Sequence, residues 1–402
     1  MLGFRLFKVE HKGDNFNIEL FKINEKPDKC EFNSEKNDEG MNMNNYFEIS
    51  PLDFSIRKYS KFIYSRQVAG KTDADFKTDK YSKRGSIYNK LFERKFIISL
   101  REANVGINNK LRLWMNYKFF DVEKLKRLCI YGIPYEIRGE IWCHLLGSKK
   151  MLLCNLNKYK KEVSEFVDKE IENQINLDLN RTFTNVILDK DANDSEIVME
   201  LYRVLKAFSS FDSKIGYCQS LNFIAAILLV NMKEELAFWT LVQLISHKRN
   251  EDFMICNWSN LENYYKDGME GIICDMKVLK QLCKSMIPKV HERFEYFGID
   301  IQWFAIEWFL CLFVTTFPNI AAMRLLDFIF CFGSCSLFSI SIALLDINKN
   351  RIISSNDMEE CINAIKSVGK YSKDPQQIIQ KAMKYNIRES YIRFQRSKII
   401  LN

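Results

Sequence analysis

The stretch IGYCQSLNFIAAILLV, residues 215–230, decides the fold. It runs without a break from a polar cluster, which includes Gly216, Gln219 and Asn222, into an apolar segment that must be buried. The apolar segment predicts a core helix over residues 220–232. A serine or asparagine could cap the start of such a helix, but glutamine is not a capping residue. The uncharged amide of Gln219 therefore needs another explanation.

The rest of the chain favours a fold built from helices. Of its 402 residues, 47% are hydrophobic and 13% aromatic, which supplies a sizeable core. No proline, the residue that breaks helices, occurs between Pro134 and Pro288. We expect an all-α, multi-helix domain. Apolar residues at helical spacing predict further helices at residues 196–209, 236–247, 271–285, 301–316, 320–330, 336–346 and 374–386.

The pattern divides the chain into three parts. Residues 1–87 are rich in Asn and Lys and lack a period, so we expect a low-complexity, partly disordered N-terminal region. Residues 88–125 predict helices that lead into the domain, and residues 126–395 predict the domain itself.

One uncharged segment, FIFCFGSCSLFSISIALL at residues 328–345, reaches the minimum length for a membrane span. Its four serines, two cysteines and glycine make it too polar for a span, so we expect a buried helix pair. The N-terminus has no secretory pattern. The twelve cysteines lack disulfide or zinc spacing and favour a reducing compartment. These features predict a cytoplasmic protein.

The charge pattern gives little sign of a nucleic-acid partner. The net charge is +8, but the basic residues are mostly lysines mixed with acids, with no Arg-rich stripe or aromatic RNA-binding signature. Weak attraction to an anionic membrane is compatible with this charge, but an ordinary solvated surface is the preferred explanation. The four histidines are scattered, so we expect no metal site.

Three short polar patterns stand out, and each has an ordinary structural explanation when taken alone. Arg138 and Trp142 form RxxxW and would share a helix face, as an arginine stem packed on an indole does. Tyr217 and Gln219 form YxQ, which could be a polar loop before a helix.

The third pattern lies between these two. Ile175, Asp178 and Arg181 form IxxDxxR. Asp178 and Arg181 are one helical turn apart, as in many surface ion pairs.

Together and in this order, GIPYEIRGEIWCHLLG, INLDLNRTF and IGYCQSLNFIAAILL resemble the TBC domain of Rab GTPase-activating proteins. That family is all-α and has RxxxW, IxxDxxR and YxQ as its signature motifs. The resemblance extends over about residues 126–395. It departs at Thr184, where the family usually has Pro, and at Ser220 and Leu221, where it usually has Gly-Met.

The resemblance implies a role for Gln219. It matches the glutamine finger, and Arg181 matches the arginine finger, that such proteins insert in trans into a GTP-bound Rab. Asp178 would orient Arg181 or its loop, and Tyr217 would pack and fix the turn that it shares with Gln219. Ile175, Arg138 and Trp142 would be structural. The chain would bind no nucleotide or other cofactor itself, because GTP and Mg²⁺ come with the GTPase, and it has no P-loop.

The resemblance leaves a second interpretation open. A TBC-like module could bind a small GTPase or a trafficking complex as a scaffold without catalysis. In both interpretations the protein would act in vesicle traffic, and it would reach endomembranes peripherally through its partner. The particular Rab, the organelle, the oligomeric state and the role of residues 1–87 do not follow from the sequence.

Overall fold

The computed structural model describes residues 9–12, 15–18, 122–135, 137–182, 195–256, 258, 261–266, 268–371 and 374–400. The predicted regions 1–87 and 88–125 therefore lie largely outside the described residues, and their expected character stays a prediction.

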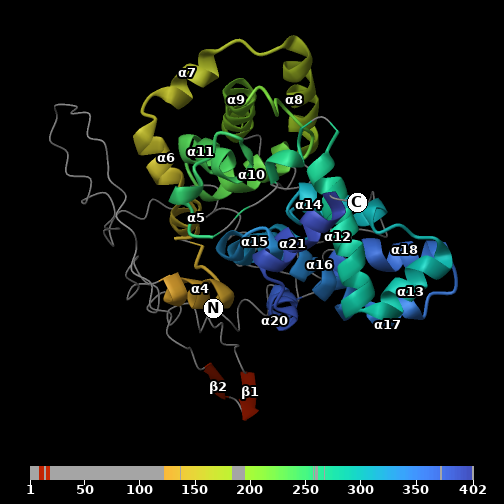
Figure 1. Cartoon of the computed structure of the whole chain (residues 1–402). Coiled ribbons are helices and arrows are strands. Elements are labelled where there is room, and N and C mark those ends of the chain that lie inside the picture. Colours follow the sequence, from red (N-terminus) through yellow and green to blue (C-terminus); the bar gives the residue numbers. More distant parts are fainter. Residues whose placement is uncertain are drawn as a thin grey trace, which may run out of the picture. The chain divides into compact units, whose positions relative to one another are not determined.

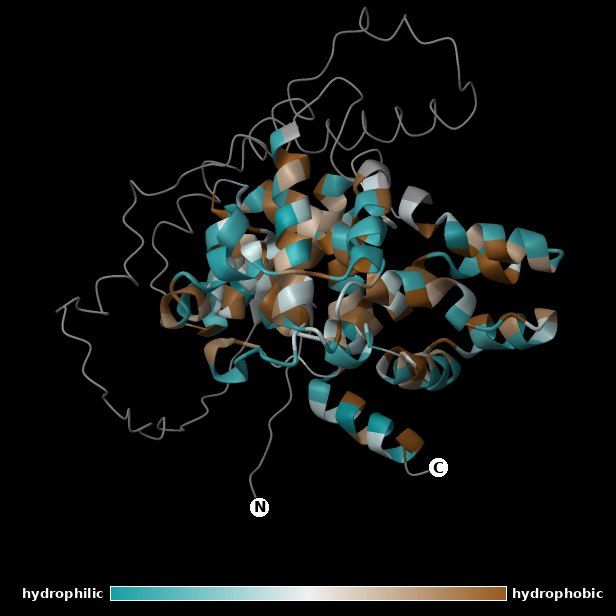
Figure 2. Cartoon of the chain, turned by 90° about the horizontal axis from the view of Figure 1, so that it is seen from above, coloured by the Kyte–Doolittle hydropathy of each residue, from teal (hydrophilic) through white to brown (hydrophobic). Residues whose placement is uncertain are grey.

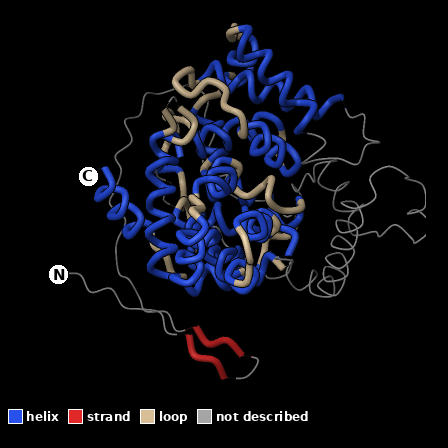
Figure 3. Tube along the Cα trace, turned by 90° about the vertical axis from the view of Figure 1, so that its right-hand side faces the viewer, coloured by secondary structure: helices blue, strands red, loops and turns tan. Residues whose placement is uncertain are grey.

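The described part of the N-terminal region is a β-hairpin that the sequence analysis did not predict. Strand β1 (Val9–Lys12) pairs antiparallel with β2 (Asn15–Ile18), with Val9 opposite Ile18. These are the two red strands in Figure 3. The hairpin falls in the first of the two units into which the chain divides, residues 1–48.

Helices make up the regular structure described from residue 122 onward, which confirms the expected all-α fold (Figure 3). Its first half contains α4 (Val122–Tyr131), α5 (Arg138–Leu146), α6 (Ser148–Cys154), α7 (Lys158–Ser164), α8 (Lys169–Thr182), α9 (Ser195–Phe211), α10 (Leu221–Asn231), α11 (Glu234–Ile245), η4 (Glu251–Phe253) and η5 (Leu261–Asn263). Its second half contains α12 (Glu270–Met286), α13 (Pro288–Phe297), α14 (Gln302–Leu310), α15 (Asn319–Phe332), α16 (Cys335–Ile347), α17 (Lys349–Ile353), α18 (Met358–Lys366), α19 (Val368–Tyr371), α20 (Pro375–Tyr385) and α21 (Glu389–Ile400).

The first half is built around α10. This helix packs against α8, α9 and α11, while α6 and α7 cover α11 and α9 (Figure 1). Every residue from Leu221 to Val230 is buried, as its uniformly apolar sequence predicts. The opening stretch of the sequence analysis is thus the central helix of this half.

The second half is built around α16. It contacts α12, α14, α15 and α20, and its residues from Cys335 to Asp346 are all buried. In Figure 2 the apolar colour lies mainly on the inward surfaces of the helices. Helix α15 joins the two halves, because it contacts α4 and α5 as well as α16 and α20.

The segment at residues 328–345 is the buried helix pair that we expected. It forms the end of α15 and most of α16. Among the described residues, no helix combines the length and the apolar character needed to cross a membrane.

One predicted helix is too long. The sequence predicts a helix over 301–316, but α14 ends at Leu310 and turns follow. Leu312 and Phe313 have φ values of 48° and 63°, in the left-handed region that a right-handed helix cannot include. Both side chains are fully buried there, so packing outweighs the local preference for helix.

Candidate functional site

Arg138 and Trp142, the RxxxW pair, meet on one buried carboxylate. Arg138 Nε donates to Asp327 Oδ1 at 3.0 Å, and Trp142 Nε1 donates to the same oxygen at 3.0 Å. The backbone N–H of Ile133 donates to Asp327 Oδ2 at 3.1 Å. Asp327 has no exposed surface. The motif therefore ties α5 and the segment before it to α15.

Gly139, which lies between Arg138 and Trp142, allows close contact between α5 and α10. A Cβ atom on Gly139 would lie 2.0 Å from the backbone oxygen of Asn231, at the end of α10. Trp142 packs edge-on against Phe330 of α15, with ring centroids 4.9 Å apart. Glycine at position 139 thus lets α5 approach α10 while Trp142 holds α15.

The IxxDxxR and YxQ motifs are joined by a hydrogen bond. The hydroxyl of Tyr217 donates to Asp178 Oδ2 at 2.5 Å. Both side chains are buried, and Ile175 anchors α8 in the core with no exposed surface. The structure thus brings together Asp178 and Tyr217, which are 39 residues apart in the sequence.

A second connection runs beside the first. The hydroxyl of Thr182 donates to the carbonyl of Asp178 at 2.6 Å and accepts from Asn222 Nδ2 at 2.6 Å. Asn222 Oδ1 in turn accepts the backbone N–H of Ser220 at 3.0 Å. The end of α8 and the start of α10 are therefore linked by buried side chains.

The loop that carries Gln219 is also anchored at its beginning. Asp212 Oδ2 accepts from the hydroxyl of Ser246 at 2.7 Å and from the N–H of His247 at 2.8 Å. Burial alone would raise the pKa of Asp212, but these hydrogen bonds and the nearby His247 ring outweigh it and lower the pKa. The ionised carboxylate fastens the loop to the end of α11.

The two candidate finger positions lie at the ends of these anchored segments. Gln219 is exposed, in the turn directly before α10. Arg181 lies in the last turn of α8, and its side chain is outside the described part of the structure. Thr184 lies outside the described residues altogether.

The described side chains near Gln219 do not suggest a nucleophile or a metal centre. Burial raises the pKa of the Cys218 thiol, and the nearby Asp178 adds to the rise, so the reactive thiolate is disfavoured. Among the described residues, no group of three or more His, Cys, Asp and Glu side chains could hold a metal ion.

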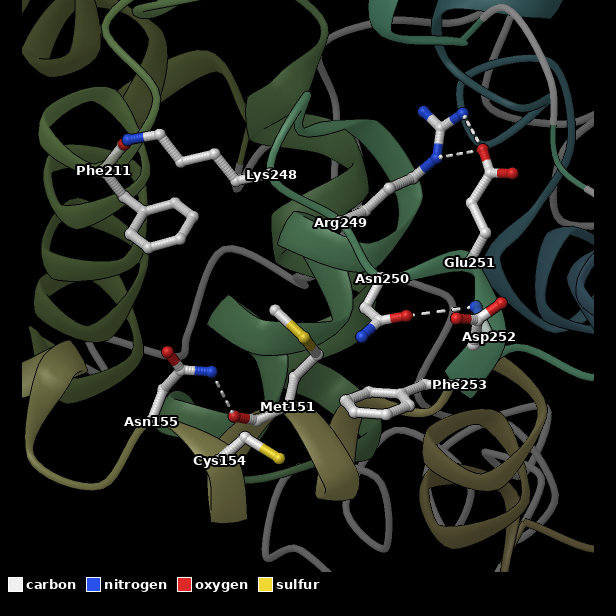
Figure 4. A pocket seen from close by; sticks show the side chains of 10 residues that line it. All are labelled: Met151, Cys154, Asn155, Phe211, Lys248, Arg249, Asn250, Glu251, Asp252 and Phe253. Atoms are coloured by element: carbon white, nitrogen blue, oxygen red, sulfur yellow. Dashed lines mark hydrogen bonds and ion pairs between the residues drawn. The ribbon is translucent and has the colours of Figure 1, made fainter. Parts of the chain in front are cut away.

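An open cavity of about 550 Å³ lies elsewhere, between the end of α6 and the segment 248–253 (Figure 4). Several of its polar side chains are bonded to neighbours. Lys248 donates to the Phe211 carbonyl, Arg249 Nη2 donates to Glu251 at 2.7 Å, and Asn155 donates to the Met151 carbonyl at 2.8 Å. None of the motif residues lines this cavity, so we do not regard it as the functional site.

Asp327, Thr182 and Asn222 were not assigned as site residues from the sequence. For two of them the sequence does indicate a buried polar role, because Asp327 and Asn222 are polar residues inside otherwise apolar helices. A polar side chain in such a run is buried and must find a partner. The sequence does not show which distant segment supplies that partner.

The comparisons with known proteins agree with this geometry. The model of the Rab-GTPase-TBC domain family matches residues 135–353. Growth hormone-regulated TBC protein 1 of Xenopus tropicalis is 31% identical over 250 residues, which are 61% of this chain and 69% of that protein. TBC1 domain family member 10A of Mus musculus is 30% identical over 289 residues, which are 71% of this chain and 54% of that protein.

Solved structures share the fold. The Chlamydomonas flagellar RabGAP TBC domain superposes with a TM-score of 0.60 at 24% identity, covering 70% of this chain and 92% of that one. The Ypt/Rab-GAP domain of Gyp1p superposes with a TM-score of 0.56 at 18% identity, covering 69% and 98%.

The Asp327 contacts predict a large loss of stability in Asp327→Asn. The change leaves the buried Arg138 guanidinium without its counter-charge, which costs about 3–5 kcal/mol in comparable buried pairs. Chemical denaturation followed by circular dichroism measures this loss. The exposed Asp252→Asn is the control and should have little effect. Equal stability of the two variants would contradict the assigned role of Asp327.

The backbone conformation of Ser220 predicts that a glycine variant is more stable than an alanine variant at this position, which is the reverse of the order in a helix. Its φ is 104°, a left-handed value that glycine adopts readily. Ser220→Gly should therefore be more stable than Ser220→Ala by about 1 kcal/mol, because alanine keeps the Cβ strain. At the exposed Ser397 in helix α21, alanine should instead be the more stable of the two. Denaturant titration of the four variants checks the reversal, and the same order at both sites would refute it.

Proposed function

Because the chain belongs to the Rab-GTPase-TBC domain family, we propose that it is a GTPase-activating protein for a Rab-family small GTPase. The family match covers both segments that carry the candidate fingers. A relative in Emericella nidulans, 28% identical over 269 residues, is named a putative GTPase-activating protein. The partner would be GTP-bound, and the activity would serve vesicle traffic at membranes that the partner occupies.

In the proposed mechanism, Arg181 and Gln219 enter the nucleotide site of the partner. GTP hydrolysis needs a positioned water and stabilisation of the charge on the transferring phosphoryl group. A guanidinium suits the phosphate oxygens because it is always charged and its donors form a fork. The amide of Gln219 can accept from the attacking water and donate to a phosphate oxygen. Mg²⁺ and GTP would be supplied by the partner.

The observation that carries this proposal is the contrast between the exposed Gln219 and its buried supports. Asp178, Tyr217 and Asn222 are buried and hydrogen-bonded around the loop, yet the amide side chain between them faces solvent. A glutamine on a loop that is held this firmly loses little conformational entropy when it contacts a partner. This arrangement favours a catalytic module over a scaffold that only binds.

Helix α8 offers a free surface beside Arg181. Glu170, Asn173, Gln174 and Leu177 are exposed, and Leu177 precedes Arg181 by four residues, which places the two positions on one face of the helix. An exposed fraction of 72% is high for a leucine. This surface could contact the GTPase as Arg181 enters its nucleotide site.

The mechanism predicts that Arg181→Ala lowers the maximal rate of stimulated hydrolysis by about 10³-fold or more, as the loss of an arginine finger does. Gln219→Ala should lower it strongly as well. Single-turnover hydrolysis by a panel of GTP-loaded Rab proteins measures this, with Gln281→Ala, an exposed amide on α12, as the matched control. Circular dichroism should show that all three variants remain folded.

Two results would count against the mechanism. If a GTPase binds in a pull-down but no panel member is accelerated, the scaffold interpretation holds instead. If the wild type is active and either finger variant keeps full activity, that residue is not a finger.

The free surface of α8 predicts a separate effect on binding. Leu177→Asp should raise the concentration needed for half-maximal stimulation by about 10-fold or more, as the loss of an apolar interface anchor does, and leave the maximal rate unchanged. Leu156→Asp is the matched control, because Leu156 is also exposed, at 67%, but lies between α6 and α7. Titration of each variant at constant GTPase concentration gives both parameters. An equal effect of the two substitutions would remove α8 from the interface.

A further inference from the structure

We propose that Thr182 and Asn222 are positioning residues, which hold Arg181 and Gln219 in register through one closed ring of buried hydrogen bonds. This inference rests on the proposed function, which assigns the two fingers. It adds two residues that belong to none of the three signature motifs.

The ring can be followed from atom to atom. Asp178 Oδ2 accepts from the Tyr217 hydroxyl, and the chain then leads through Gln219 to Ser220. The Ser220 N–H donates to Asn222 Oδ1, and Asn222 Nδ2 donates to the Thr182 hydroxyl oxygen. That hydroxyl donates to the Asp178 carbonyl, which closes the ring on the residue where it began.

Both fingers lie within this ring. Arg181 is between Asp178 and Thr182, and Gln219 is between Tyr217 and Ser220. Arg181 also lies in the last turn of α8, where backbone carbonyls lack partners within the helix and the end tends to fray. Asn222 connects this turn to the first turn of α10, which is the most enclosed helix of the first half. Movement of one finger relative to the other must therefore break a ring bond.

The burial of its members makes the ring costly to open. Asn222 and Thr182 have no exposed surface, and Asp178 is only 2% exposed. In such surroundings water does not replace a broken hydrogen bond, so each member favours the closed arrangement. An apolar pair would fill the same space, but it would not fix the direction in which the two turns face one another.

The first test compares Thr182→Val with Thr182→Ser in the full chain. Valine keeps the shape of threonine but lacks the hydroxyl. Serine keeps the hydroxyl and loses only the methyl group. Misplacing a catalytic group by about 1 Å can cost about 10²-fold in rate, so valine should lower the maximal single-turnover rate to about that extent. The Kd for the GTPase loaded with a non-hydrolysable GTP analogue should stay within about threefold of the wild type, because the contact surface is intact. Serine should recover most of the rate.

The second test does not depend on a change at Thr182. Tyr217→Phe opens the opposite side of the ring without creating a cavity, and it should lower the maximal rate with an unchanged Kd. The double variant Thr182→Val/Tyr217→Phe should be little slower than the slower single variant, since residues that act as a unit are not additive. A purely structural role would instead lower stability without separating rate from affinity.

The outcomes separate this inference from the proposed function. If the wild type accelerates no GTPase, the proposed function fails and the positioning role fails with it. If the wild type is active and folded Thr182→Val or Tyr217→Phe keeps its full maximal rate, only the ring is refuted. Multiplicative rate losses in the double variant would show that the two sides act separately, which also overturns the inference.

Discussion

The fold depends on one carboxylate that has no contact with water. An ionised group in that position is stable only when donors surround it. Asp327 receives three kinds of donor, a guanidinium, an indole and a backbone amide, and all three come from the segment between Ile133 and Trp142. Since α15 also packs on α16 and α20, this carboxylate joins the helices built around α10 to those built around α16. The placement of the candidate site relative to the second half follows from it.

The core helices were predicted well from sequence patterns, because the spacing of apolar residues follows directly from which positions are buried. Helices α9, α10, α15 and α16 begin and end within two residues of the predicted ranges. Where a segment is apolar throughout, as at residues 301–316, hydrophobicity marks no end, and buried left-handed residues stop α14 early. The hairpin at Val9–Ile18 was missed because a polar, aperiodic region gives too little signal for short strands.

The candidate site was only partly predictable for a different reason. Motif spacing pointed to Asp178 and Tyr217, and these two do meet. The partners of Asn222 and Asp327 could not be named, because a buried polar residue shows that it needs a partner but not which segment provides it. The Ser220 position shows the same limit of local patterns. A non-glycine residue adopts a glycine-like φ there because the turn is held on both sides by tertiary hydrogen bonds.

The enclosure of α10 has a consequence for how such a protein can diverge. A substitution inside α10 changes the core and the start of the helix together, so changes there endanger folding and the geometry around Gln219 at once. The outer face of α8 differs from α10, because Leu177 and its neighbours there are exposed and contribute little to the packing of the core. Substitutions on the outer face of α8 can therefore accumulate while the core and the geometry of the candidate site stay fixed. Descendants of one ancestral domain can thus diverge on that face without first gaining stability.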